Sequence, residues 1–556
     1  MSVAERVREA YARISAVDRP EVWISLLPEA DAVRQAEDID RRVVDGESLP
    51  LAGSLAAVKD NIDVAGFDTT AGSRRFAYRP SADATAVARL RAAGACVIGK
   101  TNLDQFATGL VGTRSPFGAV RSAWDPTRIS GGSSSGSAVA VAMGLVDIAL
   151  GTDTAGSGRV PAALNGIVGV KPTVGLVPTT GVVPACRTID CVTVFARELT
   201  LARAVTEIMS GPDGIDPIAR VDRPAPAIEA RPRVAVPTSE HLDGLAAGWK
   251  EAFHRLVASL PAMGIDVVEV DIAPLLDAAA LLYGGAFVAE RTAAVGDFIA
   301  EHEDLIGTDL DPSVAQIVLG GRQARAVDYF RDRERLDRWG MEGLARLDGT
   351  VALLTPTTTW HPTLAEVARD PIGANSRMGR YTNFANLLDR SALAVPAGAV
   401  AGSPFGIMLT GAPFADRTLA QLAQRLTSPA VDLLVVGAHL RGQPLNAQLV
   451  AAGGTFITEA RTAAEYRLFA LPTTPAKPGL VRVSDGGTGV AGEIWRVPAA
   501  GFGGFVAALP QPMGIGRVHL ADGTAVAGFL CEQIALDGAK DITDFGGWRA
   551  YLASSG

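Results

Sequence analysis

Between residues 51 and 199, short runs of β-branched residues alternate with alanine-rich stretches, and this alternation constrains the fold most strongly. The runs LAAVK, ACVIGK, VDIALGT and GIVGVKP have the length of buried strands, whereas DATAVARLRAAG is typical of a helix. Strands that alternate with helices build an α/β layer. A second section follows, with RVAVP, a helix near residues 245–261 and IDVVEVDI, so we expect the sheet to continue.

The rest of the chain divides into a helical section and a β-rich tail. Residues 277–346 are charged and predicted to be mostly helical, VALLTPTT is predicted to be a strand and ADRTLAQLAQRL a helix. From about residue 428, short strand-like runs are separated by Gly and Pro turns. We therefore predict an α/β domain over residues 1–428 and a small β-rich domain over residues 429–556.

Composition narrows the class of function. The chain has 556 residues, 48% hydrophobic residues and a net charge of -9, which permits a large core and argues against a nucleic-acid or anionic membrane partner. The N-terminus, MSVAERVREAYARI, predicts an amphipathic helix rather than a signal peptide, and no run resembles a membrane span. We expect a cytosolic protein with a small-molecule substrate and no metal. Its four cysteines, predicted to be reduced thiols, are Cys96, Cys186, Cys191 and Cys531.

The segment from Gly94 to Thr101 satisfies the G-x-x-x-x-G-K-[ST] pattern of a phosphate-binding loop. A phosphate cradle needs flexible residues between its glycines, whereas ACVI is a strand-like sequence that follows a helix. We interpret the segment as a helix-to-strand turn, with phosphate binding as the alternative.

The run Gly132-Ser133-Ser134-Ser135-Gly136 satisfies G-x-S-x-G, the nucleophile elbow of α/β-hydrolases. An elbow would make Ser134 the nucleophile and would require a histidine base later in the chain. None of the histidines lies in a recognisable catalytic loop, although all of them follow the run: His241, His254, His302, His361, His439 and His519. The elbow stays an alternative.

Three segments form a more specific signal: AVKDN from Ala57, GGSSSGSA from Gly131 and GTDTAGSGRVPA from Gly151. This set resembles the amidase signature family, and the similarity extends over about residues 50–415, including ADATAVARLRAAGACVIGKTNLDQFA and GIVGVKPT. The resemblance implies an α/β amidase signature fold, with a mixed central β-sheet flanked by helices. It also implies a serine amidohydrolase that needs no cofactor.

Carried onto matching positions, the resemblance implies a triad of Ser157 as nucleophile, Ser133 as bridging serine and Lys59 as base, with a cis peptide at Gly132-Ser133. A serine hydroxyl is a weak nucleophile until a neighbouring group accepts its proton. Lysine accepts a proton only when neutral, and burial favours that form by lowering the pKa of the amine. Ser133 would relay the proton. Taken alone, Lys59 would be interpreted as a surface lysine that ends a strand, the commonest position of a lysine.

The amides of Thr154, Ala155, Gly156 and Ser157 resemble the oxyanion hole of the family. Each such donor is worth about 3–4 kcal/mol of barrier, because it points at the charge that develops on the tetrahedral oxygen. Gly158 departs from the isoleucine that often follows the nucleophile in the family.

Within the family, TAGSGRVPA, RYTNFANLLD and PFGIMLTGAPFAD are most similar to the allophanate hydrolases. This similarity implies hydrolysis of allophanate, a carboxylated urea, to ammonia and carbon dioxide through an acyl-enzyme on Ser157 and N-carboxycarbamate. Tyr283 and Arg291 resemble the residues that hold the substrate carboxylate. They are eight residues apart, about two turns, so we expect them on one face of a helix. The alternative is a core tyrosine and an arginine paired with Glu290 or solvent.

The tail segments VVGAHLRGQPLN and DITDFGGWRAYLA resemble the second domain of the same enzymes, which implies a γ-glutamyl cyclotransferase-like fold. In the subgroup this domain is proposed to assist the decarboxylation step. His439 is its candidate acid/base residue, with a structural histidine as the alternative. The resemblance also implies a homodimer through the amidase domain, and a link to a urea carboxylase or to a cyanuric acid/biuret pathway.

Two other functions stay open. One is a general small-amide amidase or a component of a transamidation enzyme for aminoacylated tRNA, although the acidic charge and the tail argue against tRNA. The other is a non-catalytic amidase fold that serves as a binding protein. Such a protein would be expected to lack part of the triad, whereas Lys59, Ser133 and Ser157 are all present.

Overall fold

The computed structural model describes residues 2–224, 228–427 and 430–555. Internal contacts divide the chain into two compact units, Met1–Ala258 with Asp266–Gln424, and Ser259–Ile265 with Arg425–Gly556. The predicted boundary between residues 428 and 429 lies outside the described residues and stays a prediction. All four cysteines are free thiols.

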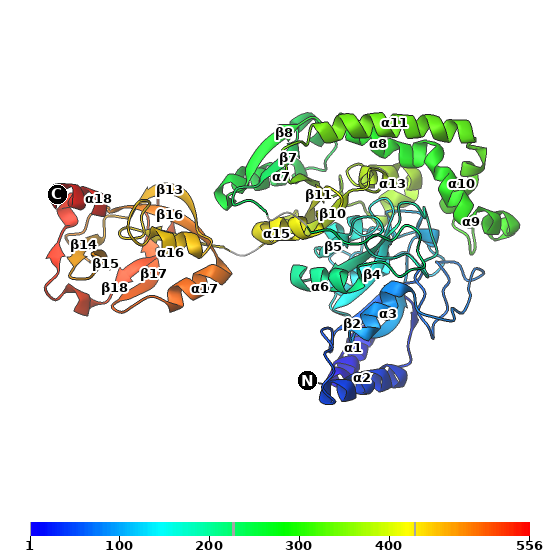
Figure 1. The fold of residues 1–556 in the computed structure, drawn as a ribbon, viewed down its shortest axis with the longest axis horizontal. Helices are drawn as coiled ribbons and strands as arrows, with labels where there is room; N and C mark the ends of the chain where they lie inside the picture. The colour runs from blue at the N-terminus through cyan, green and yellow to red at the C-terminus, as the bar shows by residue number, and fades with distance from the viewer. Residues whose placement is uncertain (1, 225–227, 428–429, 556) are drawn as a thin grey trace. The chain divides into compact units, whose positions relative to one another are not determined.

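A mixed sheet forms the centre of the first unit (Figure 1). Over the described residues it has eleven strands, in the order β1 (Trp23–Leu26), β3 (Cys96–Thr101), β2 (Leu55–Lys59), β4 (Ile148–Asp153), β6 (Cys191–Ala196), β5 (Val168–Lys171), β10 (Ser391–Val400), β11 (Ser403–Gly411), β9 (Ala352–Pro356), β7 (Arg233–Pro237) and β8 (Asp266–Val270). β2 is parallel to β3 and β4, and β7 is parallel to β8 and β9. The other pairs are antiparallel. The predicted mixed central sheet is confirmed.

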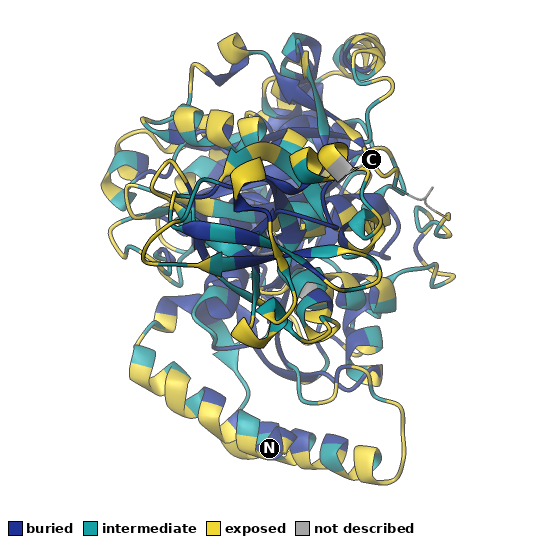
Figure 2. Cartoon of the chain, turned by 90° about the vertical axis from the view of Figure 1, so that its left-hand side faces the viewer, coloured by how far each residue is buried: buried dark blue, intermediate teal, exposed yellow. Residues whose placement is uncertain are grey.

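Helices flank this sheet, and those predicted at the N-terminus, in DATAVARLRAAG, near residues 245–261 and in ADRTLAQLAQRL are present. The N-terminal helix α1 is amphipathic (Figure 2), because its buried residues Val3, Val7 and Ala10 recur with helical spacing. Ser2 and Glu5 form a capping box at its start. The helices over the sheet are α1 (Val3–Val17), α2 (Glu29–Val44), α3 (Thr85–Ala92), α4 (Ser135–Ala142), α5 (Val160–Asn165), α6 (Leu199–Met209), α7 (Trp249–Ser259), α12 (Leu364–Arg369), α13 (Pro371–Met378), α14 (Asn383–Leu387) and α15 (Asp416–Thr427).

The section predicted to be mostly helical forms a layer of its own in Figure 1. It consists of α8 (Ala273–Gly284), η5 (Ala286–Val288), α9 (Ala289–Glu301), η6 (Glu303–Leu305), α10 (Pro312–Gly320), η7 (Gly321–Gln323) and α11 (Ala326–Ala345). α11 packs against α8, and α10 against α9. Across the described ranges, no helix by itself has both the length and the apolarity to cross a membrane; α8 and Ala286–Glu301 meet those criteria only as a pair bent by 46°.

The second unit is β-rich, as predicted. In its described part, one sheet has the order β13 (Thr455–Arg461), β16 (Ala491–Pro498), β12 (Ala430–Val435), β18 (Ala525–Cys531) and β17 (Met513–His519), and another has the order β15 (Lys477–Arg482), β14 (Tyr466–Leu471) and β19 (Lys540–Asp541). Three helices were not predicted: α16 (Asn446–Ala451), α17 (Ala499–Ala507) and α18 (Trp548–Ser555). Leu433, Tyr466 and Trp495 belong to the core of this unit. The γ-glutamyl cyclotransferase-like fold stays a prediction.

Candidate active site

The predicted base meets two hydroxyl groups where two parallel strands end. Lys59 is the last residue of β2, and β4 lies parallel beside it, so the carboxyl ends of the two strands are neighbours. Lys59 Nζ lies 2.8 Å from Ser133 Oγ and 2.8 Å from Thr152 Oγ1. The predicted base and bridging serine are therefore in direct contact.

Burial shifts Lys59 toward its neutral amine, the form that the predicted role as a base requires. Its side chain is 0% exposed, and the lost hydration disfavours the ammonium, which lowers the pKa of Lys59 from 10.5 to about 7. The carboxylates of Asp104, Asp190 and Asp153 oppose this shift, and the guanidinium of Arg291 adds to it. The alternative of a surface lysine is wrong.

The backbone at Ser133 is hydrogen-bonded to Asp104. The Gly132-Ser133 peptide is cis, and the carbonyl oxygen of Ser133 accepts the N–H of Asp104 at 3.0 Å. A Cβ atom on Gly132 would lie 2.1 Å from Asp104 Oδ2, so only glycine fits at this position. The Asp104 carboxylate in turn accepts the N–H groups of Val111, Gly112 and Arg114.

Ser157 follows β4, precedes α5 and is 1% exposed. Its Oγ donates to the carbonyl oxygen of Gly109 at 3.4 Å. Within the described residues there is no hydrogen bond between Ser157 and Ser133. The hydroxyl of Ser157 is therefore turned toward Gly109, and both its role as nucleophile and the proton relay between the two serines stay predictions.

The backbone amides of residues 154–158, around Ser157, differ in their hydrogen bonding. The N–H groups of Gly156 and Gly158 donate to the Asp153 carboxylate, both at 2.9 Å. The N–H of Ala155 meets no acceptor in the part of the chain that the structure describes. Of the amides predicted to form the oxyanion hole, that of Gly156 is thus engaged by a carboxylate, while those of Thr154, Ala155 and Ser157 stay predictions.

Sequence reasoning missed the ion pair that supports this loop. Arg159 binds Asp153 through Nε at 2.9 Å and Nη2 at 2.8 Å, and both side chains are fully buried. Asn386 accepts from Arg159 Nη2 at 2.8 Å and donates to the carbonyl oxygen of Asp153 at 2.8 Å. Burial alone would raise the pKa of Asp153, but the charge and hydrogen bonds of Arg159 lower it. The available signal was the Asp and Arg that flank the nucleophile in DTAGSGR.

The departure at Gly158 has a steric explanation. A Cβ atom on Gly158 would lie 2.2 Å from Thr193 Oγ1 on β6. Thr193 therefore occupies the space that a side chain at position 158 would need.

The prediction that Tyr283 and Arg291 lie on one face of a continuous helix is wrong. α8 ends at Gly284, η5 follows, and the chain bends by 46°. The bend nevertheless brings the two side chains together, with Arg291 Nη2 3.1 Å from Tyr283 Oη and the guanidinium 5.0 Å from the ring centroid. The paired glycines, Gly284 and Gly285, were the signal for a break.

Arg291 is 1% exposed, and its Nη1 donates to Thr108 Oγ1 at 3.0 Å and to the carbonyl oxygen of Ala107 at 3.4 Å. Glu290 accepts from Thr188 instead, so the alternative of solvent or Glu290 as the hydrogen-bond partner of Arg291 is wrong. Arg291 Nε has no hydrogen-bond partner among the described residues. A buried guanidinium with a free N–H suits a small carboxylate.

Ser157 and Arg291 converge on one loop, residues 107–109. Asn375 of α13 accepts the next backbone N–H of that loop at 2.7 Å. Asn375 and Tyr283 also line a cavity of about 740 Å³. The cavity is therefore lined by one of the two carboxylate-binding candidates, Tyr283, and by the residue that binds the loop at Leu110.

His439 lines a separate cavity of about 750 Å³ in the second unit, together with Gln448, Lys477 and many apolar residues. Its Nε2 lies 3.1 Å from Gln448 Oε1, and its ring stacks on Phe529 at 4.8 Å. Burial lowers the pKa of His439, so the neutral ring predominates at pH 7. The geometry suits either an acid/base residue or a packed histidine, and the role stays a prediction.

The two alternative motifs have structural explanations. In the first, β3 follows α3 as interpreted, and Lys100 pairs with Asp60 at 3.2 Å, with both side chains fully buried. That pair leaves Lys100 engaged inside the protein. In the second, Ser134 Oγ donates to the carbonyl oxygen of Thr152 at 3.1 Å, so this hydroxyl supports the backbone beside Lys59.

The sheet, the buried lysine and the serine loop define the class of protein: the amidase family model matches residues 5–420, and the chain belongs to the amidase family. A model of the allophanate hydrolase C-terminal domain matches residues 431–553. The chain is 39% identical to a solved structure of Kluyveromyces lactis allophanate hydrolase, with a TM-score of 0.70 over 100% of this chain and 97% of that one.

Two curated relatives differ in how much of them the chain covers. Urea amidolyase of Saccharomyces cerevisiae is 42% identical over 95% of this chain, but the match covers only 31% of the relative, so this chain spans about a third of its length. One subunit of the glutamyl-tRNA(Gln) amidotransferase of Symbiobacterium thermophilum is 35% identical over 76% of this chain and 92% of the relative.

Proposed function

We propose that the chain hydrolyses allophanate to ammonia and carbon dioxide. The observation that carries this proposal is Arg291, which is buried, has a free Nε, contacts Tyr283 and shares its loop with the acceptor of Ser157. Allophanate has an amide at one end and a carboxylate at the other, so a single bound molecule can reach both groups. The similarity to Kluyveromyces lactis allophanate hydrolase supports the same substrate.

The first step uses the contacts around Lys59. Neutral Lys59 takes the proton of Ser133, Ser133 takes that of Ser157, and Ser157 Oγ attacks the terminal amide carbonyl. Free amides of the serine loop, such as that of Ala155, stabilise the oxyanion. The proton returns along the same groups to the leaving ammonia, and Ser157 retains the acyl group.

The second step releases the acid. Water hydrolyses the acyl-enzyme to N-carboxycarbamate, which loses carbon dioxide to form carbamate. Carbamate breaks down to the second ammonia and the second carbon dioxide. His439 in the second unit is the candidate acid/base residue for this decarboxylation, because it lines a cavity large enough for the small dianion.

The same proposal extends to the setting of the enzyme. A urea carboxylase would supply allophanate, and the similarity to urea amidolyase supports such a link; a cyanuric acid/biuret pathway is the other proposed source. We also propose a cytosolic homodimer that acts on this small anion.

Comparison of three substrates tests the proposal. Wild-type enzyme should release ammonia from allophanate faster than from malonamate, and far faster than from biuret, in which a neutral amide replaces the carboxylate. Arg291→Ala should raise KM for allophanate by about 10- to 100-fold with a smaller effect on kcat, because hydrogen bonds to a charged group contribute about 1.5–3 kcal/mol. Steady-state ammonia release measures both quantities.

Turnover of biuret by Arg291→Ala serves as the control, and it should equal that of wild type. Equal turnover of biuret and allophanate by wild type would show a general amidase and overturn the substrate assignment.

The pH dependence of the reaction reports on Lys59. Because only the neutral amine accepts a proton, kcat/KM should rise as the pH is raised through about 7, the pKa of Lys59, and then level off. Below that pKa the rate should fall about tenfold per pH unit. Burial raises the pKa of Asp190 to about 6, so its negative charge is present across the upper part of this range. A flat profile from about pH 5.5 to about pH 8.5 would exclude Lys59 as the base.

A further inference from the structure

The contact between Tyr283 and Arg291 depends on the bend between α8 and α9. Tyr283 is in α8 and Arg291 is in α9, so the distance between their side chains depends on the angle between the two helices. The three residues of η5 connect the helices, so whatever holds η5 sets the angle between them. That angle in turn sets the position of the guanidinium relative to the phenol.

Asp332 of α11 holds η5 directly. Its side chain is buried, and Oδ2 accepts the N–H of Ala286, the first residue of η5, at 2.7 Å. Gly285 lets the carboxylate approach, because a Cβ atom there would lie 2.7 Å from Asp332 Oδ2. A second contact joins the same elements, where the ring of Tyr329 meets that of Phe287 edge to face at 5.4 Å.

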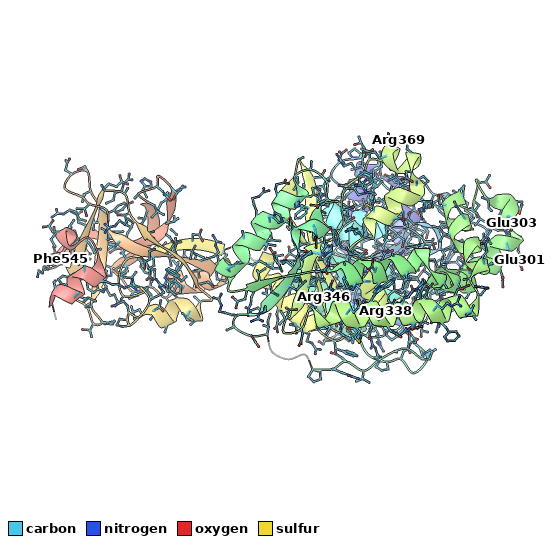
Figure 3. The ribbon with its side chains drawn as sticks, turned by 90° about the horizontal axis from the view of Figure 1, so that it is seen from above. Glu301, Glu303, Arg338, Arg346, Arg369 and Phe545 are labelled. Carbon is cyan, nitrogen blue, oxygen red and sulfur yellow. The ribbon has the colours of Figure 1, made fainter. Side chains whose placement is uncertain are left out.

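The position of Asp332 on α11 distinguishes it from its neighbours on that helix. Arg338 of α11 and Arg346, which follows the helix, are exposed (Figure 3). Asp328 and Asp332 both line the cavity beside Tyr283, and each accepts from an arginine, Asp328 from Arg325 and Asp332 Oδ1 from Arg335 at 3.1 Å. Asp332 in addition accepts the N–H of Ala286 through Oδ2. Asp332 is thus the carboxylate of this pair that reaches the bend.

We propose that Asp332 is a positioning residue for substrate selectivity: by capping η5 it fixes the bend that presents Arg291 and Tyr283 to a substrate carboxylate. The inference rests on the proposed function, in which these two residues bind the carboxylate. Asp332 lines the cavity beside Tyr283, but its Oδ2 is engaged by the N–H of Ala286, so we assign it the positioning of Arg291 and Tyr283. Its loss affects recognition of the anionic end of the substrate and leaves the attack by Ser157 intact.

Kinetics of three variants test this role. Asp332→Ala should raise KM for allophanate about tenfold, since it removes the hydrogen bond that caps η5 together with the pairing to Arg335, while kcat and the turnover of biuret stay within about twofold of wild type. Asp332→Asn should restore KM, because its amide oxygen can still accept the N–H of Ala286. Asp337→Ala is the matched control and should leave KM unchanged, because Asp337 is an exposed carboxylate on the same helix and pairs with Arg333.

A fourth variant covers the case in which Asp332→Ala does not fold. Gly285→Ala keeps Asp332 but displaces its carboxylate, and it should raise KM in the same way. Binding of malonate, measured by calorimetry, should weaken in parallel with the rise in KM. This measurement tests the role of Asp332 even if wild type does not hydrolyse allophanate, and that result would contradict only the proposed function. An equal loss of allophanate and biuret turnover in Asp332→Ala, or unchanged KM in Gly285→Ala, would overturn the inference.

Discussion

A Ser157→Ala variant is expected to lose allophanate hydrolysis almost completely and to keep its affinity for the substrate. Removal of a serine nucleophile lowers kcat by a factor of about 10⁴–10⁶, because the acyl-enzyme cannot form and only the other groups of the site remain. Substrate affinity should persist, since Arg291 and Tyr283 are untouched. Single-turnover ammonia release and calorimetric binding of allophanate measure the two quantities.

Ser134→Ala is the matched control, because Ser134 is the nucleophile of the alternative elbow interpretation. Its hydroxyl hydrogen-bonds the backbone at Thr152, so we expect a loss of no more than about tenfold in kcat, consistent with about 1 kcal/mol for one neutral hydrogen bond. The opposite pattern, with Ser134→Ala inactive and Ser157→Ala active, would replace the triad by an elbow.

A Lys59→Met variant is expected to be inactive and yet more stable than wild type at pH 7. Loss of a general base lowers the rate by about 10²–10⁴-fold. Stability should increase because the pKa of Lys59 falls from 10.5 in the unfolded chain to about 7 in the folded protein. Burial of the protonated amine therefore lowers the free energy of unfolding of the wild type, and methionine removes this penalty. This penalty on folding is fully present at and below pH 7 and vanishes as the pH approaches 10.5. Denaturant unfolding at pH 7 and pH 9 should therefore show a gain that shrinks with pH.

Lys100→Met provides the contrast, since Lys100 is equally buried but pairs with Asp60. Its removal leaves a buried carboxylate without its ion-pair partner, which typically costs about 3–5 kcal/mol. A Lys59→Met protein that unfolds more readily than wild type at pH 7 would mean that Asp104 and Asp190 stabilise the ammonium more than burial disfavours it.

The strands of the first unit could be predicted because their signal is local. A run such as LAAVK is apolar throughout except for its final lysine, and β2 is buried at each of its five residues. Lys59, Ser133 and Ser157 could be proposed because each lies in a short motif. The cis peptide at Gly132-Ser133 followed from the same resemblance and is present in the structure.

The bend between α8 and α9 could not be predicted from helical spacing. Eight residues make about two turns only if the helix is continuous, and the Gly284-Gly285 pair interrupts it. Two contacts were also missed because they join distant residues: the hydrogen bond from Asn386 to the loop before Ser157, and the hydrogen bond from Arg291 to Thr108. Asn386 and Asp153 are 233 positions apart, and Arg291 and Thr108 are 183 positions apart.

The sequence alone determined which residues are the candidates for the chemistry, since each of them lies in a motif of residues that are adjacent along the chain. Only the tertiary structure decided the state of those residues. Enclosure by strands and loops removes water from Lys59 and thereby lowers the pKa of its amine. Packing of α11 on α8 likewise brings Asp332 to η5, and the bend between α8 and α9 brings Arg291 to Tyr283, because side-chain geometry depends on how separate elements fold together.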